Sequence, residues 1–388
     1  MRERNLRVLE FTKIRDQLAA LCLSETGKER AGALVPSGDE KMVRLWQEQT
    51  SEAGTVTAYT GGSPMQYFPD VSGFVKIAAA GGTLSMKALI SVADALKAAR
   101  LVRQAVVTDR ENTPHLTQLA SHLNTHRELE ETIFNAILSE DEVADRASPE
   151  LYDIRRHLRL LADRMREKLN AFLRGENAKY LQDAIITQRN GRYVLPVKAE
   201  CRTNVPGLIH DQSASGATLF IEPMAVVEAG NDLKQWAAKE EKEIERILAQ
   251  LSAEVAPDAA FIANNQNILA ELDVIFAKAI LGRQMRAVEP KLNAEGRLSI
   301  VSGRHPLIDP AQVVPISLWM GGEFTSLIIT GPNTGGKTVT MKTVGLMTLM
   351  AQAGLHIPAN LGTELAIFDE VFADIGDEQS IEQSLSTF

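Results

Sequence analysis

A long amphipathic segment in the middle of the chain restricts the fold more than any other feature. In Pro149–Arg174, apolar residues such as Leu151, Ile154 and Leu158 recur every three or four positions. This spacing aligns them on one face of a helix, and its persistence over about three heptads is typical of two helices that pack lengthwise. The other face carries a set of cations: Arg155, Arg156, Arg159, Arg164, Arg166 and Lys168.

A second long helix is predicted from about residue 223 to 255, and its charge is opposite to that of the first. It contains the acidic run KEEKEIER, which begins at Lys239. Two long helices of opposite charge favour an antiparallel pair, although charge runs also occur on faces that contact only solvent.

The segment between the two helices has the pattern of a small β unit. Asn190-Gly191 lies between β-forming residues, which is a strong signal for a hairpin turn. Pro206-Gly207 and the run DQSASG, residues 211–216, mark two further turns. We therefore expect a β-rich insertion, residues 183–222, at the end of a two-helix stalk.

The two ends of the chain differ in pattern. Helices joined by loops are predicted for about the first 110 residues, with one helix over residues 8–23 and another that Ser85 caps. From about Pro290, short apolar strands alternate with a helix, which is typical of an α/β domain. The predicted fold class is multidomain: a mainly α-helical part with a small β insertion, followed by a partial α/β domain.

A phosphate-binding loop is predicted near the end of the sequence. Its residues match the pattern G-x-x-x-x-G-K-[ST] in full: Gly331, Pro332, Asn333, Thr334, Gly335, Gly336, Lys337 and Thr338. Ser326–Thr330 is predicted to enter the loop as a strand, and a helix is predicted to leave it, so a chance glycine-rich turn is disfavoured. We expect backbone amides to surround the phosphates of ATP, Lys337 to reach the β- and γ-phosphates, and Thr338 to bind Mg²⁺.

A carboxylate that polarises the attacking water is the other requirement of such a site. Asp369 and Glu370 follow an apolar run, but they come only one helix and one strand after Lys337. We therefore favour a strand end followed by a loop over a catalytic role for this pair. No Ser-His-Asp set stands out.

Composition limits the class of protein. The formal net charge of −9 argues against a chain that is basic throughout, so contact with a polyanion requires a local patch. Cys22 and Cys201 are the two cysteines, which fits a reducing, cytoplasmic location. The N-terminus is charged and no apolar run reaches the length of a membrane span, so neither a signal peptide nor a membrane partner is expected.

Several polar residues outside the loop are weaker candidates. A cluster of cations in the β insertion is a speculative nucleic-acid contact, with solvated hairpin charges as the alternative: Arg189, Arg192, Lys198 and Arg202. His122 and His126 have the spacing of two metal ligands on one helix face, but an exposed polar helix is favoured. His210 could contact a partner or stabilise a turn. His305-Pro306 is expected near the nucleotide edge of the α/β domain.

The C-terminal part contains the motifs GRHPLI, ITGPNTGGKT and AQAGLHIPA. These motifs resemble the MutS family, and the resemblance extends over the whole chain. The ending VFADIGDEQSIEQSLSTF and the inserted TQRNGRYVLPVKAE resemble the second bacterial branch, which carries an Smr domain and lacks the mismatch-recognition and connector domains. This resemblance implies the following division: a helical core over 1–148, lever helices over 149–182 and 223–289, a clamp over 183–222, and an incomplete ABC-type P-loop ATPase domain over 290–388.

The resemblance also implies a function. Such proteins are homodimeric ATP hydrolases in which the signature serine, here Ser386, completes the nucleotide site of the other subunit. They suppress homologous recombination by acting on branched DNA, with an endonuclease in the full-length protein, and they split collided ribosomes, contacting rRNA. The catalytic acid is expected beyond Phe388, so the catalytic residues are unknown. This chain is expected to be an N-terminal portion that does not hydrolyse ATP by itself.

Three alternative interpretations of the sequence compare differently with this one. The first is a non-catalytic binding fragment that keeps a nucleotide loop without hydrolysis. A metabolic P-loop kinase is disfavoured by the two long helices and by the late position of the loop. An SMC-like ATPase is disfavoured because its loop would lie near the N-terminus.

Overall fold

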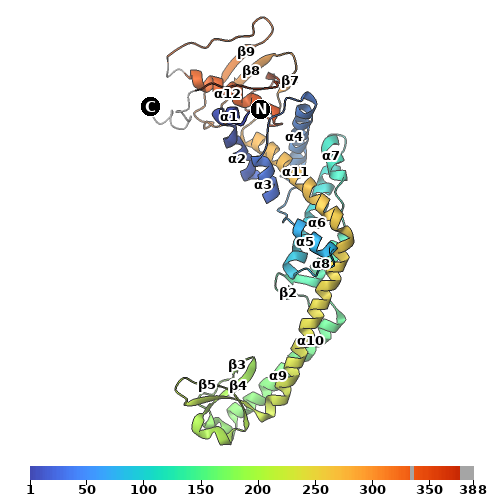
Figure 1. The fold of residues 1–388 in the computed structure, drawn as a ribbon, viewed down its shortest axis with the longest axis vertical. Coiled ribbons are helices and arrows are strands. Elements are labelled where there is room, and N and C mark those ends of the chain that lie inside the picture. The colour runs from blue at the N-terminus through green and yellow to red at the C-terminus, as the bar shows by residue number, and fades with distance from the viewer. Residues whose placement is uncertain (333–335, 376–388) are drawn as a thin grey trace. The chain divides into compact units, whose positions relative to one another are not determined.

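The computed structural model describes residues 1–332 and 336–375. Helices dominate these residues, as predicted, and they are accompanied by three small sheets (Figure 1). The chain divides into two compact units. The first comprises Met1–Ala80, Ser91–Glu131 and the described residues from Val255 onward, and the second comprises Gly81–Ile90 and Thr132–Glu254.

The first unit is built around one buried helix. α11, Ala259–Gln284, contributes both apolar and polar side chains to the interior. Asp273 on this helix accepts hydrogen bonds from the backbone N–H and the hydroxyl of Ser24, which caps α3 by accepting from Gly27 N–H. The other helices that lie wholly in this unit are α1 Glu3–Val8, α2 Phe11–Leu21, α3 Glu25–Gly32, α4 Glu40–Thr60, α5 Ser72–Ala79, α7 Pro114–Ser121 and α12 Lys337–Gln352.

One predicted helix is in fact two. The apolar spacing predicted a continuous helix over residues 8–23, but α1 ends at Val8 and α2 begins at Phe11. Glu10 between them has a φ of 60°, a left-handed conformation that interrupts the helix. The periodic pattern did not reveal this break, because Phe11 and Ile14 of α2 are buried at the spacing that a continuous helix would also give.

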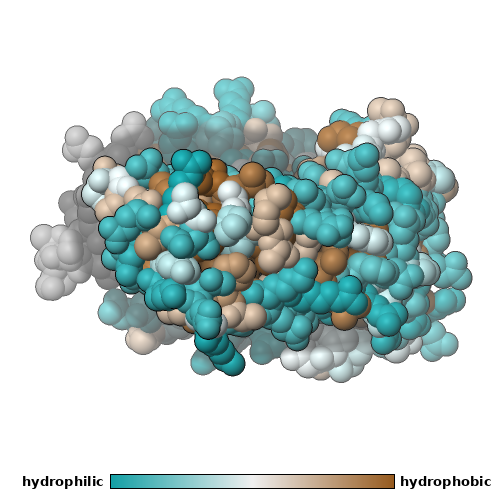
Figure 2. All heavy atoms as spheres, turned by 90° about the horizontal axis from the view of Figure 1, so that it is seen from below, coloured by the Kyte–Doolittle hydropathy of each residue, from teal (hydrophilic) through white to brown (hydrophobic). Residues whose placement is uncertain are grey.

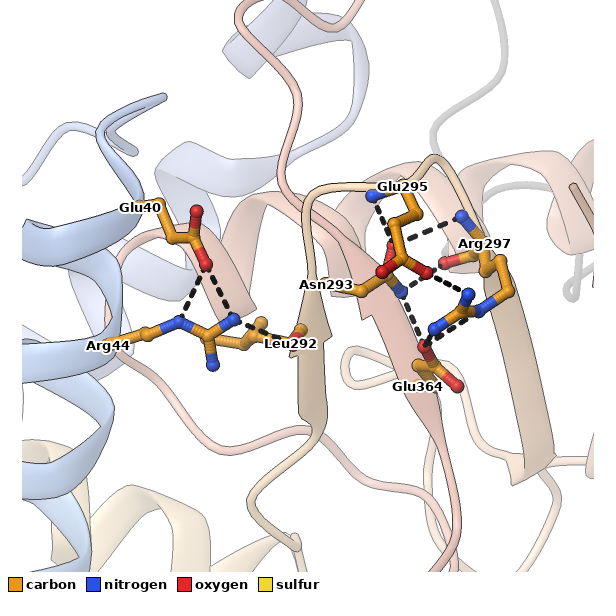
Figure 3. Close-up of polar contacts among 7 residues, drawn as sticks. All are labelled: Glu40, Arg44, Leu292, Asn293, Glu295, Arg297 and Glu364. Carbon is orange, nitrogen blue, oxygen red and sulfur yellow. Dashed lines mark hydrogen bonds and ion pairs between the residues drawn. The ribbon is translucent and has the colours of Figure 1, made fainter.

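A mixed four-stranded sheet accompanies these helices in the first unit. Its order is β7-β10-β8-β9, with β10 parallel to β7 and antiparallel to β8. Side chains tie it together (Figure 3): Arg44 of α4 donates to Leu292 O at 3.0 Å, and Asn293 donates to the Glu364 carboxylate at 2.8 Å. The strands are β7 Lys291–Asn293, β8 Leu298–Gly303, β9 Ile316–Met320 and β10 Glu364–Ala366.

The strand predicted before the phosphate-binding loop is not formed. Residues 325–330 have no strand assignment, and the Ile328 side chain is 86% exposed. A strand needs a neighbour for its backbone N–H and C=O groups, and within the described residues no strand pairs with this segment. The prediction of an entering strand over 326–330 is therefore wrong for this structure, whereas the predicted leaving helix is present as α12.

The second unit contains the two long helices, and both predictions of their extent are confirmed. α9 spans Pro149–Arg174 and α10 spans Met224–Val255, of which the last residue falls in the first unit. They run antiparallel, because residues near the start of α9 contact residues late in α10, and residues near the end of α9 contact the start of α10. Arg155 donates to Glu240 at 2.7 Å, and Lys168 donates to Ala225 O at 3.1 Å.

The β insertion of the second unit is also confirmed. It forms an antiparallel sheet of order β3-β4-β6-β5. The turn between β3 and β4 is Asn190-Gly191, and both residues have positive φ values, 51° and 70°, as a tight hairpin turn requires. The strands are β3 Thr187–Arg189, β4 Arg192–Lys198, β5 Gly207–Gln212 and β6 Thr218–Pro223.

The remaining elements are short or run from one unit into the other. Polar residues cover most of the face seen in Figure 2, with smaller apolar patches between them. Among the described helices, none combines the length and the apolar character needed to cross a membrane. The remaining elements are α6 Met86–Val107, α8 Arg127–Ala136, β1 Ile137–Ser139, β2 Glu142–Val143 and the 3-10 helices Glu176–Tyr180, Ala199–Asn204 and Ala256–Asp258.

Candidate nucleotide-binding site

The described part of the glycine-rich loop has the backbone freedom that a phosphate cradle needs. Gly331 has a φ of 145° and Gly336 a φ of 76°, both outside the range that other residues readily adopt. A Cβ at either position would meet open space, so backbone conformation rather than crowding requires glycine there. The predicted loop residues Asn333, Thr334 and Gly335, and the predicted signature residue Ser386, lie outside the described residues.

The helix that leaves the loop has an N-terminus without a side-chain cap among the described residues. This helix, α12, begins at Lys337. The first amides of an uncapped helix lack partners within the helix, and the helix dipole adds partial positive charge there. Thr338 follows in the same first turn, so the proposed metal ligand lies beside these amides. The arrangement fits a phosphate group.

The Lys337 ammonium folds back onto the loop. It donates to Gly331 O at 2.5 Å and to Pro332 O at 2.7 Å. These neutral carbonyls are weaker partners for an ammonium than a phosphate oxygen would be. The lysine is therefore held at the mouth of the loop by contacts that a phosphate can replace.

Asp369 and Glu370 lie after a strand end, in a loop. β10 ends at Ala366, and the following backbone is held by Gln352 of α12, which donates to Phe368 O at 2.8 Å. Both carboxylates are exposed, and Glu370 pairs with Arg2 at 4.0 Å. In the described residues, no contact joins either carboxylate to Lys337 or Thr338.

His305 is a buried side chain of the first unit. It is 3% exposed, and its Nδ1 accepts from Leu307 N–H at 3.3 Å. Burial lowers the pKa of His305 to about 4, and the charge of Glu10 opposes this shift only in part. The imidazole is therefore neutral near pH 7. The neighbouring Arg304 donates to Arg286 O at 2.8 Å, just beyond the C-terminal end of α11.

The structure separates the four cations proposed as a nucleic-acid contact. Arg189 and Arg192 lie at one end of β4, and Lys198 and Arg202 lie at the other, a separation of about 20 Å at the rise of a strand. Arg192 pairs with the buried carboxylate of Glu222 at 3.2 Å.

The other three cations differ in their partners. Arg189 lies 3.1 Å from Asp211 and stacks over Phe220. Lys198 donates to Lys179 O at 3.3 Å, and Arg202 is exposed. Arg202 and Lys198 are therefore better placed to meet a phosphate than Arg192.

The other three histidines considered as site candidates make structural contacts. His122 Nδ1 lies 2.9 Å from Gln118 O, His126 contacts Asp258, and His210 Nε2 lies 2.7 Å from Glu222. Within the described residues, no group of three or more possible ligands is arranged to hold a metal ion.

One relationship at this site was not visible in the sequence. The carboxylate of Glu10 lies 3.1 Å from the ammonium of Lys342 in α12, and both side chains are at least 90% buried. The two residues are 332 positions apart. A glutamate beside a helix of the N-terminal region gives no local signal that could have identified this partner.

Comparison with known proteins decides the family. Residues 327–388 match the family described as MutS domain V. The whole chain is 50% identical to "Endonuclease MutS2" of Alkaliphilus oremlandii (strain OhILAs), covering 50% of that protein. It is 47% identical to the protein of the same description from Clostridioides difficile (strain 630), again covering 50% of it.

The chain belongs to the MutS family. Its full-length match to proteins described as MutS2 confirms the second branch that the motifs indicated. The chain spans about half the length of the curated MutS2 relatives it matches. The glycine-rich loop lies within the part that matches MutS domain V, and so does α12.

Proposed function

We propose that the chain is the nucleotide-binding and clamp-forming part of an ATP-dependent MutS2 protein. The observation that carries this proposal is the loop 331–338 at the start of α12, with Gly331 and Gly336 at positive φ. The phosphates of ATP would replace the loop carbonyls as partners of Lys337. The Thr338 hydroxyl would bind Mg²⁺, which would add positive charge to that of Lys337.

The division of labour along the chain follows the family resemblance. Residues 290–388 would form part of an ABC-type P-loop ATPase domain, and Ser386 would complete the nucleotide site of the partner in a homodimer. Residues 1–148 would be the helical core, and 149–182 with 223–289 the levers. The sheet within 183–222 would be the clamp that meets nucleic acid. The match of residues 327–388 to MutS domain V supports the assignment of the C-terminal part.

The partner we propose is branched DNA or the rRNA of a collided ribosome. ATP binding would close the dimer on it, with Lys198 and Arg202 near the backbone phosphates. Relatives are described as endonucleases. We propose that activity for the full-length protein and not for this chain alone, and the same holds for suppression of recombination and for ribosome rescue. Two free cysteines, Cys22 and Cys201, support a cytoplasmic location.

Nucleotide binding without hydrolysis is a second candidate function for this chain. It is favoured by one observation: among the described residues, Lys337 donates to backbone carbonyls, and no carboxylate there contacts Lys337 or Thr338. A site whose described residues hold no carboxylate beside the loop would bind ATP without activating water through those residues.

The test is calorimetric titration of the chain with ATPγS in the presence of Mg²⁺. We expect binding by the unchanged chain and its loss in Lys337→Ala. Lys41→Ala, at an exposed lysine in the first turn of α4, is the matched control and should bind normally. Equal affinity of the Lys337→Ala variant would refute the proposed site, and an unchanged chain that does not bind would refute the function.

A further inference from the structure

Glu10 occupies a position where a glycine is the common residue. It lies two residues after the end of α1 and directly before α2, and its φ of 60° is left-handed. Helices often end with a residue in this conformation, and glycine adopts it without steric cost. A glutamate at this position carries a backbone strain that glycine would avoid. A stabilising contact of its side chain would offset that cost.

The contact is with the helix that leaves the phosphate-binding loop. One carboxylate oxygen of Glu10 lies 3.1 Å from Lys342 Nζ, and the other lies 3.1 Å from Lys13 Nζ. Burial alone would raise the pKa of Glu10, but hydrogen bonds from the two ammonium groups outweigh it and hold the pKa below its usual value. The group is therefore a carboxylate, and it fixes the position of Lys342.

Neighbouring residues hold the same region from the same side. Leu9 packs on Gly345 of α12 so closely that a Cβ there would lie 2.8 Å from a Leu9 methyl group. Asn5 of α1 donates to Val371 O at 2.8 Å, in the segment that follows β10. Asn5, Leu9 and Glu10 therefore contact α12 or the segment after β10.

We propose that Glu10 is a positioning residue for nucleotide binding, acting through Lys342 on the first turn of α12. The proposal rests on the proposed nucleotide site. Lys342 lies in the second turn, about 7 Å along the axis from Lys337. The amides of the first turn must point at the phosphates, and a small tilt of the helix misdirects all of them together with Lys337.

Substitutions separate positioning from simple stabilisation. Glu10→Gln removes the Glu10 carboxylate from the buried Lys342 ammonium, so it should lower both the melting temperature and the affinity for ATPγS with Mg²⁺. In the double variant Glu10→Gln/Lys342→Met, the ammonium is removed as well. We expect its melting temperature to recover, while its affinity stays about tenfold below that of the unchanged chain.

Two further variants complete the experiment. Glu10→Asp keeps the charge and should recover part of the affinity that Glu10→Gln loses. Glu25→Gln breaks an exposed ion pair of the same unit, in which Lys28 Nζ lies 2.6 Å from Glu25 Oε1. This pair contacts neither the described part of the loop nor α12. This matched control should leave affinity unchanged.

The outcomes distinguish this proposal from the proposed function. If the unchanged chain binds ATPγS and the double variant binds equally well, Glu10 only stabilises the fold and the positioning role is refuted. If the unchanged chain does not bind at all, the nucleotide site itself is refuted and the positioning role with it. Affinity that falls in step with melting temperature across all four variants also refutes positioning.

Discussion

The guanidinium of Arg155 on α9 lies 2.7 Å from the carboxylate of Glu240 on α10. The same side chain donates to Asp145 at 2.8 Å and to Val143 O at 2.6 Å. Burial alone would lower the pKa of Arg155, but its two carboxylate partners raise it above its usual value. Because the Arg155 side chain is only 18% exposed, water screens these contacts less than it screens a surface ion pair.

Replacing Arg155 should therefore destabilise the second unit. We expect Arg155→Met to lower the free energy of unfolding by about 2 kcal/mol, because two carboxylates and a carbonyl lose their shared donor. Urea denaturation followed by circular dichroism measures this. Arg156→Met is the control, since this neighbour is exposed, and it should change the value by less than about 0.5 kcal/mol. Equal losses in the two variants would contradict the role of the contact.

The stalk and its β insertion could be predicted because their signals are local. Apolar periodicity predicted where α9 begins and ends. The opposite charges of the two helices predicted their pairing, which the contact between Arg155 and Glu240 shows. Asn190-Gly191 needed only its own backbone preference to mark the hairpin.

The features that the sequence did not reveal depend on distant partners. The apolar run at 326–330 has strand character, but a strand forms only where another strand pairs with it, and periodicity does not supply the partner. Glu10 and Lys342 are ordinary charged residues until the fold brings them to 3.1 Å. The glycine pattern of the phosphate-binding loop was recognisable because its chemistry requires fixed residues at fixed spacing.

A buried lysine gives the first unit a dependence on pH. Lys278 on α11 is 4% exposed, and its ammonium donates to Ala353 O at 2.7 Å. Burial lowers the pKa of Lys278 to about 8, with the charge of Glu271 in partial opposition. In the unfolded chain the pKa returns to the ordinary lysine value of 10.5. Between these values the unfolded state binds more protons, so stability rises with pH.

We expect the free energy of unfolding to gain on the order of 3 kcal/mol from Lys278 between pH 8 and pH 10.5, relative to a variant without this group. Lys278→Met should lack that gain. Urea denaturation at half-unit pH steps measures the difference between the two curves. Lys41→Met, at an exposed position, should retain the gain. Parallel curves for the unchanged chain and Lys278→Met would show that the ammonium is not buried in solution.

The clamp cations should fall into two classes when they are replaced. Arg192→Gln takes the guanidinium away from Glu222, which is 1% exposed, so the melting temperature should fall. Arg202→Gln should leave the melting temperature unchanged and weaken binding of branched DNA uniformly across sequences, because a phosphate contact carries no base information. Fluorescence anisotropy at several salt concentrations measures the second effect. A reduced melting temperature in Arg202→Gln, or undiminished binding at low salt, would contradict this assignment.

ATP hydrolysis by this chain should not depend on Asp369. The residue follows β10, whose neighbours in the sheet are β7 and β8, and the segment 325–330 that leads to the loop belongs to no strand of that sheet. A carboxylate activates water at the γ-phosphate only when it is held beside the phosphate-binding loop. Asp369 is instead placed against Gly38, where an added Cβ would lie 3.1 Å from the Asp369 Cα. We therefore expect phosphate release by Asp369→Ala to equal that of the unchanged chain and to lie no higher than that of Lys337→Ala. Turnover that is robust in the unchanged chain and disappears in Asp369→Ala would instead make this residue the catalytic acid.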